Sequence, residues 1–364
     1  MKKYQHSIRF KKFSDRKSKR NEKRRSRFKG YLIRKNIERV EDQKRNPKSK
    51  RVTKNRYSNL EFSYTNVTAP TVFSFKKNPE EVIIFISKLK ELFDKQKRAF
   101  VSLRYVEEVD YDAIVVLLSI LIRFKSKKIK FNGDFPINRD ANSRLARSGF
   151  FTSLLEEFYK DSDKYKVVEN TIWTHAEKKV DAPLGGKLIE QASEVIWNDK
   201  KRCPGLQRVL LEAMLNTNNH AEIGKEGEKH WWLSMNTDKK NKKTYFSFVD
   251  YGVGVFTSLN NKPADNKFFG WFEKLINKKP FNNNAELLEL ILDGELHASV
   301  TGKSYRGKGL PGIKEAFDRN QISNLFIITN NVYANIAKKE YRLLENKFSG
   351  TFLCWELDEQ NQNF

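Results

Sequence analysis

Apolar residues recur at two different spacings over residues 59–155. The stretch EEVIIFISKLKELFDKQ (80–96) shows the three-to-four-residue spacing of an amphipathic helix, and DYDAIVVLLSILIRF (110–124) is a nearly continuous apolar helix. Short apolar runs typical of strands surround them: VFSF, AFVSLRYV and KKIKFNG. A further helix follows in NRDANSRLARSGFFTSL. This strand–helix–strand–helix order predicts a small α/β layer domain.

The same patterns predict a second domain over residues 201–358. An amphipathic helix is expected in LQRVLLEAMLNTNNHA (206–221), and a β-hairpin in HWWLSMN and KTYFSFVDYG around the polar turn TDKKNKK. A helix in IKEAFDR and strands in NLFIITNN and GTFLCWELD complete it. Residues 156–200 are interpreted as a connector with one helix, KLIEQASEVIWNDKKR, and residues 359–364 as a tail. The fold class is therefore α/β.

Positive charge is concentrated at the N-terminus. The 364 residues carry 70 Lys and Arg against 45 Asp and Glu, a formal net charge of +25. Residues 1–56 hold 24 of the basic and 5 of the acidic residues, which is +19 and leaves 46 against 40, or +6, for the rest. Residues 1–58 are interpreted as a flexible basic arm that neutralises RNA or DNA phosphates. A solvated tail, or a segment that packs on a protein partner or a second copy of the chain, remains an alternative.

Cysteine content and apolar run length point to a cytoplasmic protein. The two cysteines, Cys203 and Cys354, cannot build a disulfide framework or a thiolate zinc site. The longest apolar run, AIVVLLSILI, is half of the roughly 20 residues that a membrane span needs. The N-terminus MKKYQHSIRFKKF lacks the apolar segment of a secretory signal. We therefore expect neither membrane insertion nor secretion.

Three polar side chains share one face of the helix over 206–221. Glu212, Asn216 and His220 are four residues apart, so they align along that helix. A carboxylate can orient and deprotonate an attacking hydroxyl, and an amide oxygen one turn away can bind Mg²⁺ among phosphates. The alternative is an ordinary solvated helix face.

Two glycine-containing segments follow in the chain. Asp250, Gly252 and Gly254 end the second strand of the hairpin, where a carboxylate can accept the amine of adenine and glycines let the backbone approach the base. The alternative is an ordinary turn. In TGKSYRGKGLPG (301–312), glycines and three cations precede a helix expected after Gly312, which suits phosphate oxygens. The cations are Lys303, Arg306 and Lys308.

The ordered set E-x3-N-x3-H, DxGxG, GKGLPG and a final strand beginning Gly-Thr resembles the GHKL ATPase domain of histidine kinases, anti-sigma serine kinases, type II topoisomerases and mismatch-repair ATPases. The resemblance implies a two-layer α/β sandwich over residues 201–358 that binds ATP and Mg²⁺. It implies that Glu212 is the general base, that Asn216 is the Mg²⁺ ligand and that His220 faces the phosphates. For the base it implies that Asp250 accepts the adenine amine, that Gly252 and Gly254 line the ring and that Thr351 supports Asp250. For the phosphates it implies a cradle of Gly307, Lys308, Gly309 and Gly312. Lys303 and Arg306 add positive charge to the same segment. Pro311, where the family often has Gly, and the long span from Gly254 to Gly307 depart from the pattern.

The strand followed by VDYDAIVVLLSI, with the later SGFF, is similar to a STAS domain, the fold of anti-sigma-factor antagonists. In partners of serine kinases a Ser or Thr near this helix start accepts phosphate, whereas this chain has Asp110 and Asp112 there. These carboxylates are interpreted as N-cap and first-turn charges of the helix.

Together these features predict an ATPase or ATP-dependent switch with a STAS-like regulatory module and a basic arm. Two alternatives stay open: a nucleic-acid-binding scaffold whose ATPase-like half is inert, and a protein serine/threonine kinase that acts on a separate partner.

Overall fold

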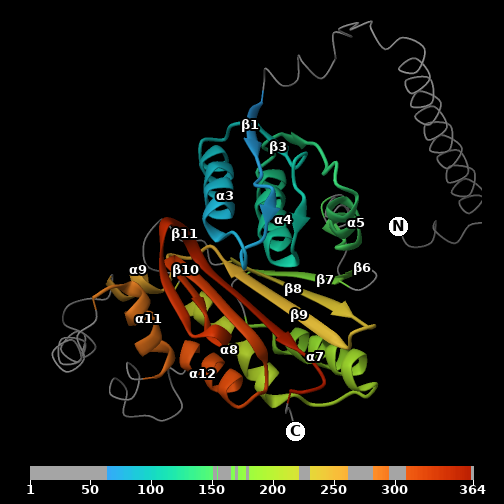
Figure 1. Cartoon of the computed structure of the whole chain (residues 1–364), viewed down its shortest axis with the longest axis vertical. Coiled ribbons are helices and arrows are strands. Elements are labelled where there is room, and N and C mark those ends of the chain that lie inside the picture. The colour runs from blue at the N-terminus through green and yellow to red at the C-terminus, as the bar shows by residue number, and fades with distance from the viewer. Residues whose placement is uncertain are drawn as a thin grey trace, which may run out of the picture. The chain divides into compact units, whose positions relative to one another are not determined.

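The chain has a mixed α/β fold with parallel and antiparallel sheets (Figure 1). The computed structural model describes residues 64–150, 154, 165–168, 171–177, 180–220, 230–260, 282–294 and 309–361. The predicted basic arm, residues 1–58, and most of the loop that carries Lys303 to Lys308 lie outside these ranges. The α/β fold class is confirmed.

The N-terminal part of the fold is a parallel sheet with its crossover helices. Strands β1 (Thr65–Thr68), β3 (Ala99–Ser102) and β5 (Phe131–Gly133) pair in the order β1-β3-β5, and β2 (Val72–Phe73) pairs with β4 (Glu108–Val109), also in parallel. Parallel neighbours need long crossovers. Helices α3 (Pro79–Asp94) and α4 (Tyr111–Ser126) supply them, and α5 (Arg139–Arg147) follows β5. The helices and strands predicted from residue 72 to residue 147 are all present.

Local sequence explains where these helices begin. Proline and two glutamates occupy the first turn of α3, where a missing N–H costs nothing and negative charge is favourable. Helix α5 begins at Asn138, whose side chain accepts hydrogen bonds from the N–H groups of Asp140 and Ala141 at 2.9 and 3.0 Å. Asp110 is the N-cap residue of α4, but its carboxylate accepts a hydrogen bond from Arg144 at 2.8 Å instead of capping the helix.

The C-terminal part is a six-stranded antiparallel sheet. Its order is β10-β11-β9-β8-β7-β6. The strands are β6 (Tyr165–Val168), β7 (Thr171–Glu177), β8 (His230–Asp238), β9 (Lys243–Asp250), β10 (Ser323–Asn335) and β11 (Glu340–Leu357). The interpretation of residues 156–200 as a connector with one helix is wrong, because β6 and β7 extend the sheet and α7 (Ala182–Trp197) packs on it. Short charged strands such as YKVV and TIWTHAE lack the long apolar run that would have marked them.

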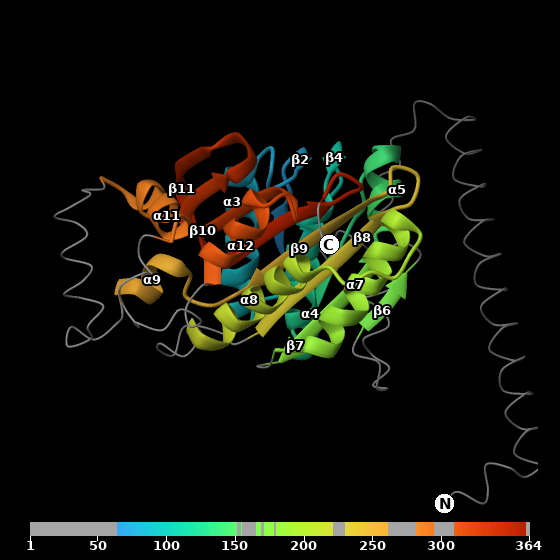
Figure 2. The ribbon, with the colours of Figure 1, turned by 90° about the horizontal axis from the view of Figure 1, so that it is seen from below.

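One face of this sheet is covered by helices. They are α7, α8 (Pro204–His220), α11 (Asn284–Leu292) and α12 (Gly309–Asp318). Helices α7, α8 and α12 lie beneath the strands in Figure 1 and in front of them in Figure 2, which views the fold from below. Their apolar residues form one buried cluster with Trp231, Phe248, Leu353 and Trp355 of the sheet. The short α9 (Val255–Asn260) contributes Phe256 to the same cluster.

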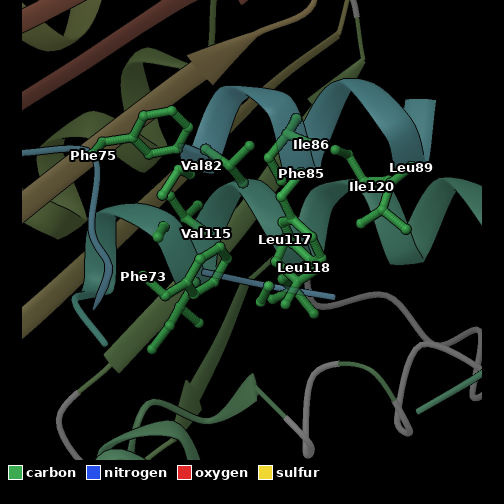
Figure 3. Close-up of a cluster of buried hydrophobic side chains, with 14 of the residues drawn as sticks. Phe73, Phe75, Val82, Phe85, Ile86, Leu89, Val115, Leu117, Leu118 and Ile120 are labelled. Carbon is green, nitrogen blue, oxygen red and sulfur yellow. The ribbon is translucent and has the colours of Figure 1, made fainter. Parts of the chain in front are cut away.

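The opposite face of the sheet is covered by the N-terminal part of the fold, β1–β5 with α3–α5, called the N-terminal layer below. Buried residues of α3 and α4, drawn in Figure 3, belong to one cluster with Val249, Tyr251 and Phe352 of the six-stranded sheet. Phe75, which follows β2, stacks on Phe352 with ring centroids 5.1 Å apart and meets Phe348 edge-on at 5.8 Å. The two predicted domains therefore share a hydrophobic core.

The last two strands are longer than predicted. β10 and β11 form one hairpin around the short 3₁₀ helix η1 (Ile336–Lys338), and their pairing extends from Ser323–Glu356 to Asn335–Glu340. The segment EYRLLENKFS alternates buried Leu344 and Phe348 with exposed positions. Its charged residues hide this alternation at the sequence level.

Two simpler features complete the fold. Cys203 and Cys354 are both buried free thiols. Across the part of the chain that is described, no helix combines the length and apolar character required to cross a bilayer.

The Phe75→Ala substitution tests the contact between the two layers. Phe75 is fully buried, so its truncation removes both ring contacts and leaves a cavity. We expect the free energy of unfolding to fall by about 3–5 kcal/mol. Urea denaturation followed by tryptophan fluorescence measures it. Tyr105→Ala is the control, because Tyr105 is 62% exposed and its loss is expected to cost about 0.5 kcal/mol or less. Equal effects of the two substitutions would refute the shared core.

Candidate functional site

Four side chains form a row across adjacent strands of the six-stranded sheet. Asp250 at the end of β9 pairs with Trp231 of β8 on one side and with Thr351 of β11 on the other, and Thr351 pairs with Thr329 of β10. Thr329 and Thr351 also bring their hydroxyl oxygens within 3.3 Å. The two sequence-predicted residues Asp250 and Thr351 are therefore direct cross-strand neighbours.

The row lies on the helix-covered face of the sheet. Side chains alternate between faces along a strand. Phe248 and Leu353 belong to the helix-side cluster, whereas Val249 and Phe352 belong to the cluster with the N-terminal layer. Asp250, two residues beyond Phe248, thus faces the layer that contains α8.

Asp250 is a buried carboxylate with few but well-placed partners. Its Oδ1 accepts a hydrogen bond from the Gly252 N–H at 2.8 Å. Burial raises the pKa of Asp250 to about 6, against the opposing effect of hydrogen bonds from Gly252 and Thr351. The carboxylate is mostly ionised at neutral pH, and as a buried acceptor it favours a ligand that brings its own donor.

The loop after Asp250 is held by β10. Asn330 accepts a hydrogen bond from the Phe256 N–H at 3.0 Å and donates one to the Val253 carbonyl at 2.9 Å. Gly254 has φ +78°, and a Cβ there would collide with the Asn330 amide. The second glycine of the DxGxG motif is thus required both by its backbone conformation and by this contact.

Tyr251 of the motif points to the other side of the sheet. Its hydroxyl lies 2.5 Å from Ser119 Oγ and donates to the Val116 carbonyl at 3.2 Å, both on α4. The guanidinium of Arg123 lies 5.0 Å from the centre of the Tyr251 ring. The loop next to Asp250 is therefore attached directly to the N-terminal layer.

The predicted helix residues meet the glycine segment. A Cβ at Gly309 would lie 2.7 Å from Asn216 Oδ1, and a Cβ at Gly312 would lie 3.0 Å from Arg208 Nε. Arg208 also forms an ion pair with Glu315 at 2.7 Å. The two glycines thus let α12 approach α8 closely and place the Asn216 amide beside the first residue of α12.

The remaining predicted residues are placed in part. Glu212 is half-buried on α8, midway between Arg208 and Asn216 on the same face. His220 is the last residue of α8. Lys303, Arg306, Gly307 and Lys308 lie outside the described residues.

One sequence-based boundary is wrong. The helix expected to begin after Gly312 begins at Gly309, so Gly309, Pro311 and Gly312 belong to its first turn. Proline is tolerated there because the first N–H groups of a helix have no intrahelical acceptor.

Three residues of the site are not identified as site residues by the sequence pattern. Trp231, Thr329 and Asn330 enter through strand register and loop contacts. Only the change from apolar to polar residues in FIITNN marked the last two, and the register that pairs them with Thr351 cannot be deduced from that pattern.

The arrangement combines a buried acceptor with the N-terminus of a helix. Both border the helix-side cluster, to which Trp231, Phe256, Met214 and Leu310 belong. The first N–H groups of α12 are suited to an anion, and the Asn216 oxygen beside them is suited to a cation. Among the described residues, His, Cys, Asp and Glu form no group of three or more that could hold a metal ion.

No protein-family model, curated protein sequence or solved structure matches the chain.

The Asp250→Asn substitution tests the buried carboxylate through pH dependence. Because the folded-state pKa is raised above the ordinary 3.8, the native state holds its proton up to higher pH than the unfolded chain. Wild-type stability is therefore lost as pH rises towards 6, by about 3 kcal/mol in total. Asn does not titrate, so the variant's stability relative to wild type should rise by about 1–2 kcal/mol between pH 5 and pH 8.

Urea unfolding at the two pH values measures this difference, and other titrating groups cancel in the comparison. Asp94→Asn, which makes the same exchange at an exposed position on α3, is the matched control. A pH-independent difference for Asp250→Asn would show that the carboxylate is not perturbed.

Proposed function

We propose that this chain is an ATP-binding protein of the GHKL type. The observation that carries the proposal is the alignment of Asp250 and Thr351 on the sheet face that α8 covers, together with the contact of Asn216 with Gly309 at the start of α12. These residues come from the four sequence segments that carry the resemblance, and they meet in pairs across segments distant in the chain.

The adenine is assigned to the Asp250 end. A buried carboxylate accepts the exocyclic amine, and Thr351 beside it holds its orientation. The loop from Tyr251 to Gly254 offers backbone groups close to the base, because neither glycine places a side chain in the way. The ring of Trp231, adjacent to Asp250 in the row, provides apolar surroundings.

The phosphates are assigned to the start of α12. Its first N–H groups, which have no acceptor within the helix, and its partial positive charge stabilise phosphate oxygens. The Asn216 Oδ1 is a hard oxygen donor of the kind that Mg²⁺ takes when phosphates and water complete its shell. Mg²⁺ bound there would neutralise phosphate charge. Glu212, one turn before Asn216, is placed to orient and deprotonate an attacking hydroxyl.

The N-terminal layer is assigned a regulatory role. It covers the second face of the sheet and contacts the nucleotide motif through Tyr251. Contact of the basic arm with RNA or DNA is part of the proposal and rests on its charge of +19 alone. An inert scaffold and a kinase for a separate partner are the competing functions, and the two experiments below separate them.

Asp250→Ala is expected to weaken Mg-ATP binding. Loss of a hydrogen bond to a charged group costs about 1.5–3 kcal/mol, which raises Kd about tenfold to 100-fold. Isothermal titration calorimetry of the full chain measures the change. Asp94→Ala, which removes the same charge from an exposed site, should bind like wild type. No Mg-ATP binding by folded wild type would refute the proposed function and favour the scaffold.

Glu212→Gln separates binding from turnover. The amide keeps the size of the side chain but cannot accept a proton, so Mg-ATP affinity should stay within about twofold while turnover falls about 100-fold or more. Release of labelled phosphate from γ-labelled ATP reports hydrolysis, and label on an added protein reports kinase activity. Unchanged turnover in the variant would exclude Glu212 as the base.

A further inference from the structure

A cavity lies on the face of the six-stranded sheet opposite to Asp250. Its volume is about 610 Å³, and it is lined by the start of α4, by α5, by the β8–β9 hairpin and by single residues of β11 and of the segment before α3. This volume is in the range of sites for small molecules. Ser247 and Cys354 line it, and both point away from the face that carries Asp250. The cavity is therefore separate from the proposed nucleotide site.

Among the described side chains of the sheet face that forms its floor, buried polar residues gather at this end. Asn236 and Tyr245 are cross-strand neighbours, as are Ser247 and Cys354, and Asn236 is 2% exposed. Further along the same face, Val249 and Phe352 pack against the N-terminal layer. Apolar side chains at these positions would have extended the contact with the N-terminal layer. The buried polar side chains found there instead indicate that this part of the sheet contacts a polar ligand.

The cavity is lined by three acidic residues, Asp110, Asp112 and Asp238, and each accepts hydrogen bonds from the protein itself. Asp238 accepts them from the backbone N–H and the side-chain amide of Asn241, at 3.0 and 2.7 Å. Asp112 accepts hydrogen bonds from the backbone N–H groups of Phe75, Lys76 and Ala113, at 3.3, 3.3 and 2.6 Å. Asp110 accepts one from Arg144 at 2.8 Å. Burial raises the pKa of Asp112 to about 7, so it carries only part of a negative charge at neutral pH. Asp110 and Asp112 therefore oppose an anion only weakly. Asp238 keeps its negative charge because, against the opposing effect of burial, hydrogen bonds from Asn241 and the nearby Lys240 lower its pKa.

The basic residues leave a positive surplus. Five basic residues line the cavity against the three aspartates: Lys76, Arg144, Arg147, Lys239 and Lys240. Arg144 pairs with Asp110, and Lys240 lies close enough to Asp238 to lower the pKa of that carboxyl. Arg147 on α5 and Lys239 in the hairpin form no ion pair with a carboxylate of the described ranges. They come from elements far apart in the sequence and converge on one space. A guanidinium with two ammonium groups matches a phosphate, which accepts several charge-assisted hydrogen bonds at once.

We propose that this cavity binds a small phosphorylated molecule. Arg147, Lys239 and Lys240 hold the phosphate at the rim, and Asn236 and Tyr245 contact the remainder of the ligand on the floor. Because α5 and the β8–β9 hairpin contribute opposite walls, such a ligand bridges the N-terminal layer and the six-stranded sheet.

Pyrophosphate is the probe, titrated into the full chain at low ionic strength and followed by calorimetry. Pyrophosphate bound at the start of α12 would not respond to substitutions in this cavity, so the variants below assign the binding to one of the two places. We expect saturable binding, with Kd raised at least tenfold by Arg147→Gln and by the pair Lys239→Gln and Lys240→Gln. Arg139→Gln removes the same charge from an exposed position on the same helix and should leave Kd within twofold.

Two results would overturn the proposal. One is the absence of saturable binding by the folded protein. The other is an equal loss of affinity in Arg147→Gln and Arg139→Gln, which would indicate general attraction of an anion to a basic protein. Neither depends on whether Mg-ATP binds at Asp250, because the nucleotide site and this cavity lie on opposite faces of the sheet.

Discussion

The structure depends on burial of both faces of one antiparallel sheet. Because side chains alternate between faces, each strand serves two layers at once. Along β9, Phe246 and Phe248 pack with the helices, whereas Val249 packs with the N-terminal layer. A shift of register by one residue would exchange these roles and bury Asp250 in the wrong core. The positions of both candidate sites follow from this one constraint.

Much of the local structure could be predicted from sequence. Helical spacing located α3 and α8, a nearly continuous apolar run located α4, and the spacing of four residues from Glu212 to Asn216 placed both on one face of α8. These features depend on contacts between near neighbours in the chain, which a periodic pattern records. The proximity of Asp250 and Thr351 was reached through resemblance, and the register of β9 with β11 agrees with it.

The rest could not be predicted, because it depends on pairing between distant segments. Nothing in TIWTHAE states that it will join β8, and nothing in IITNN states that Thr329 will pair with Thr351. The predicted start of α12 after Gly312 treats Gly309 and Gly312 as part of a phosphate-binding loop before the helix, whereas the helix begins at Gly309. Here close packing of Gly309 on Asn216 outweighs the low helix propensity of glycine.

The Tyr251 hydroxyl has a consequence for motion. It sits inside an otherwise apolar contact, with Ser119 and Val116 of α4 as its partners. Withdrawing it without a new partner would leave the phenol hydroxyl unsatisfied away from solvent, a penalty of about 1–3 kcal/mol, whereas Ser119 keeps its own hydrogen bond to the Val116 carbonyl at 2.7 Å. A rearrangement of the loop beside Asp250 must either meet that penalty or carry α4 along with it. The phenol therefore works as a mechanical linkage through the sheet, from one face to the other.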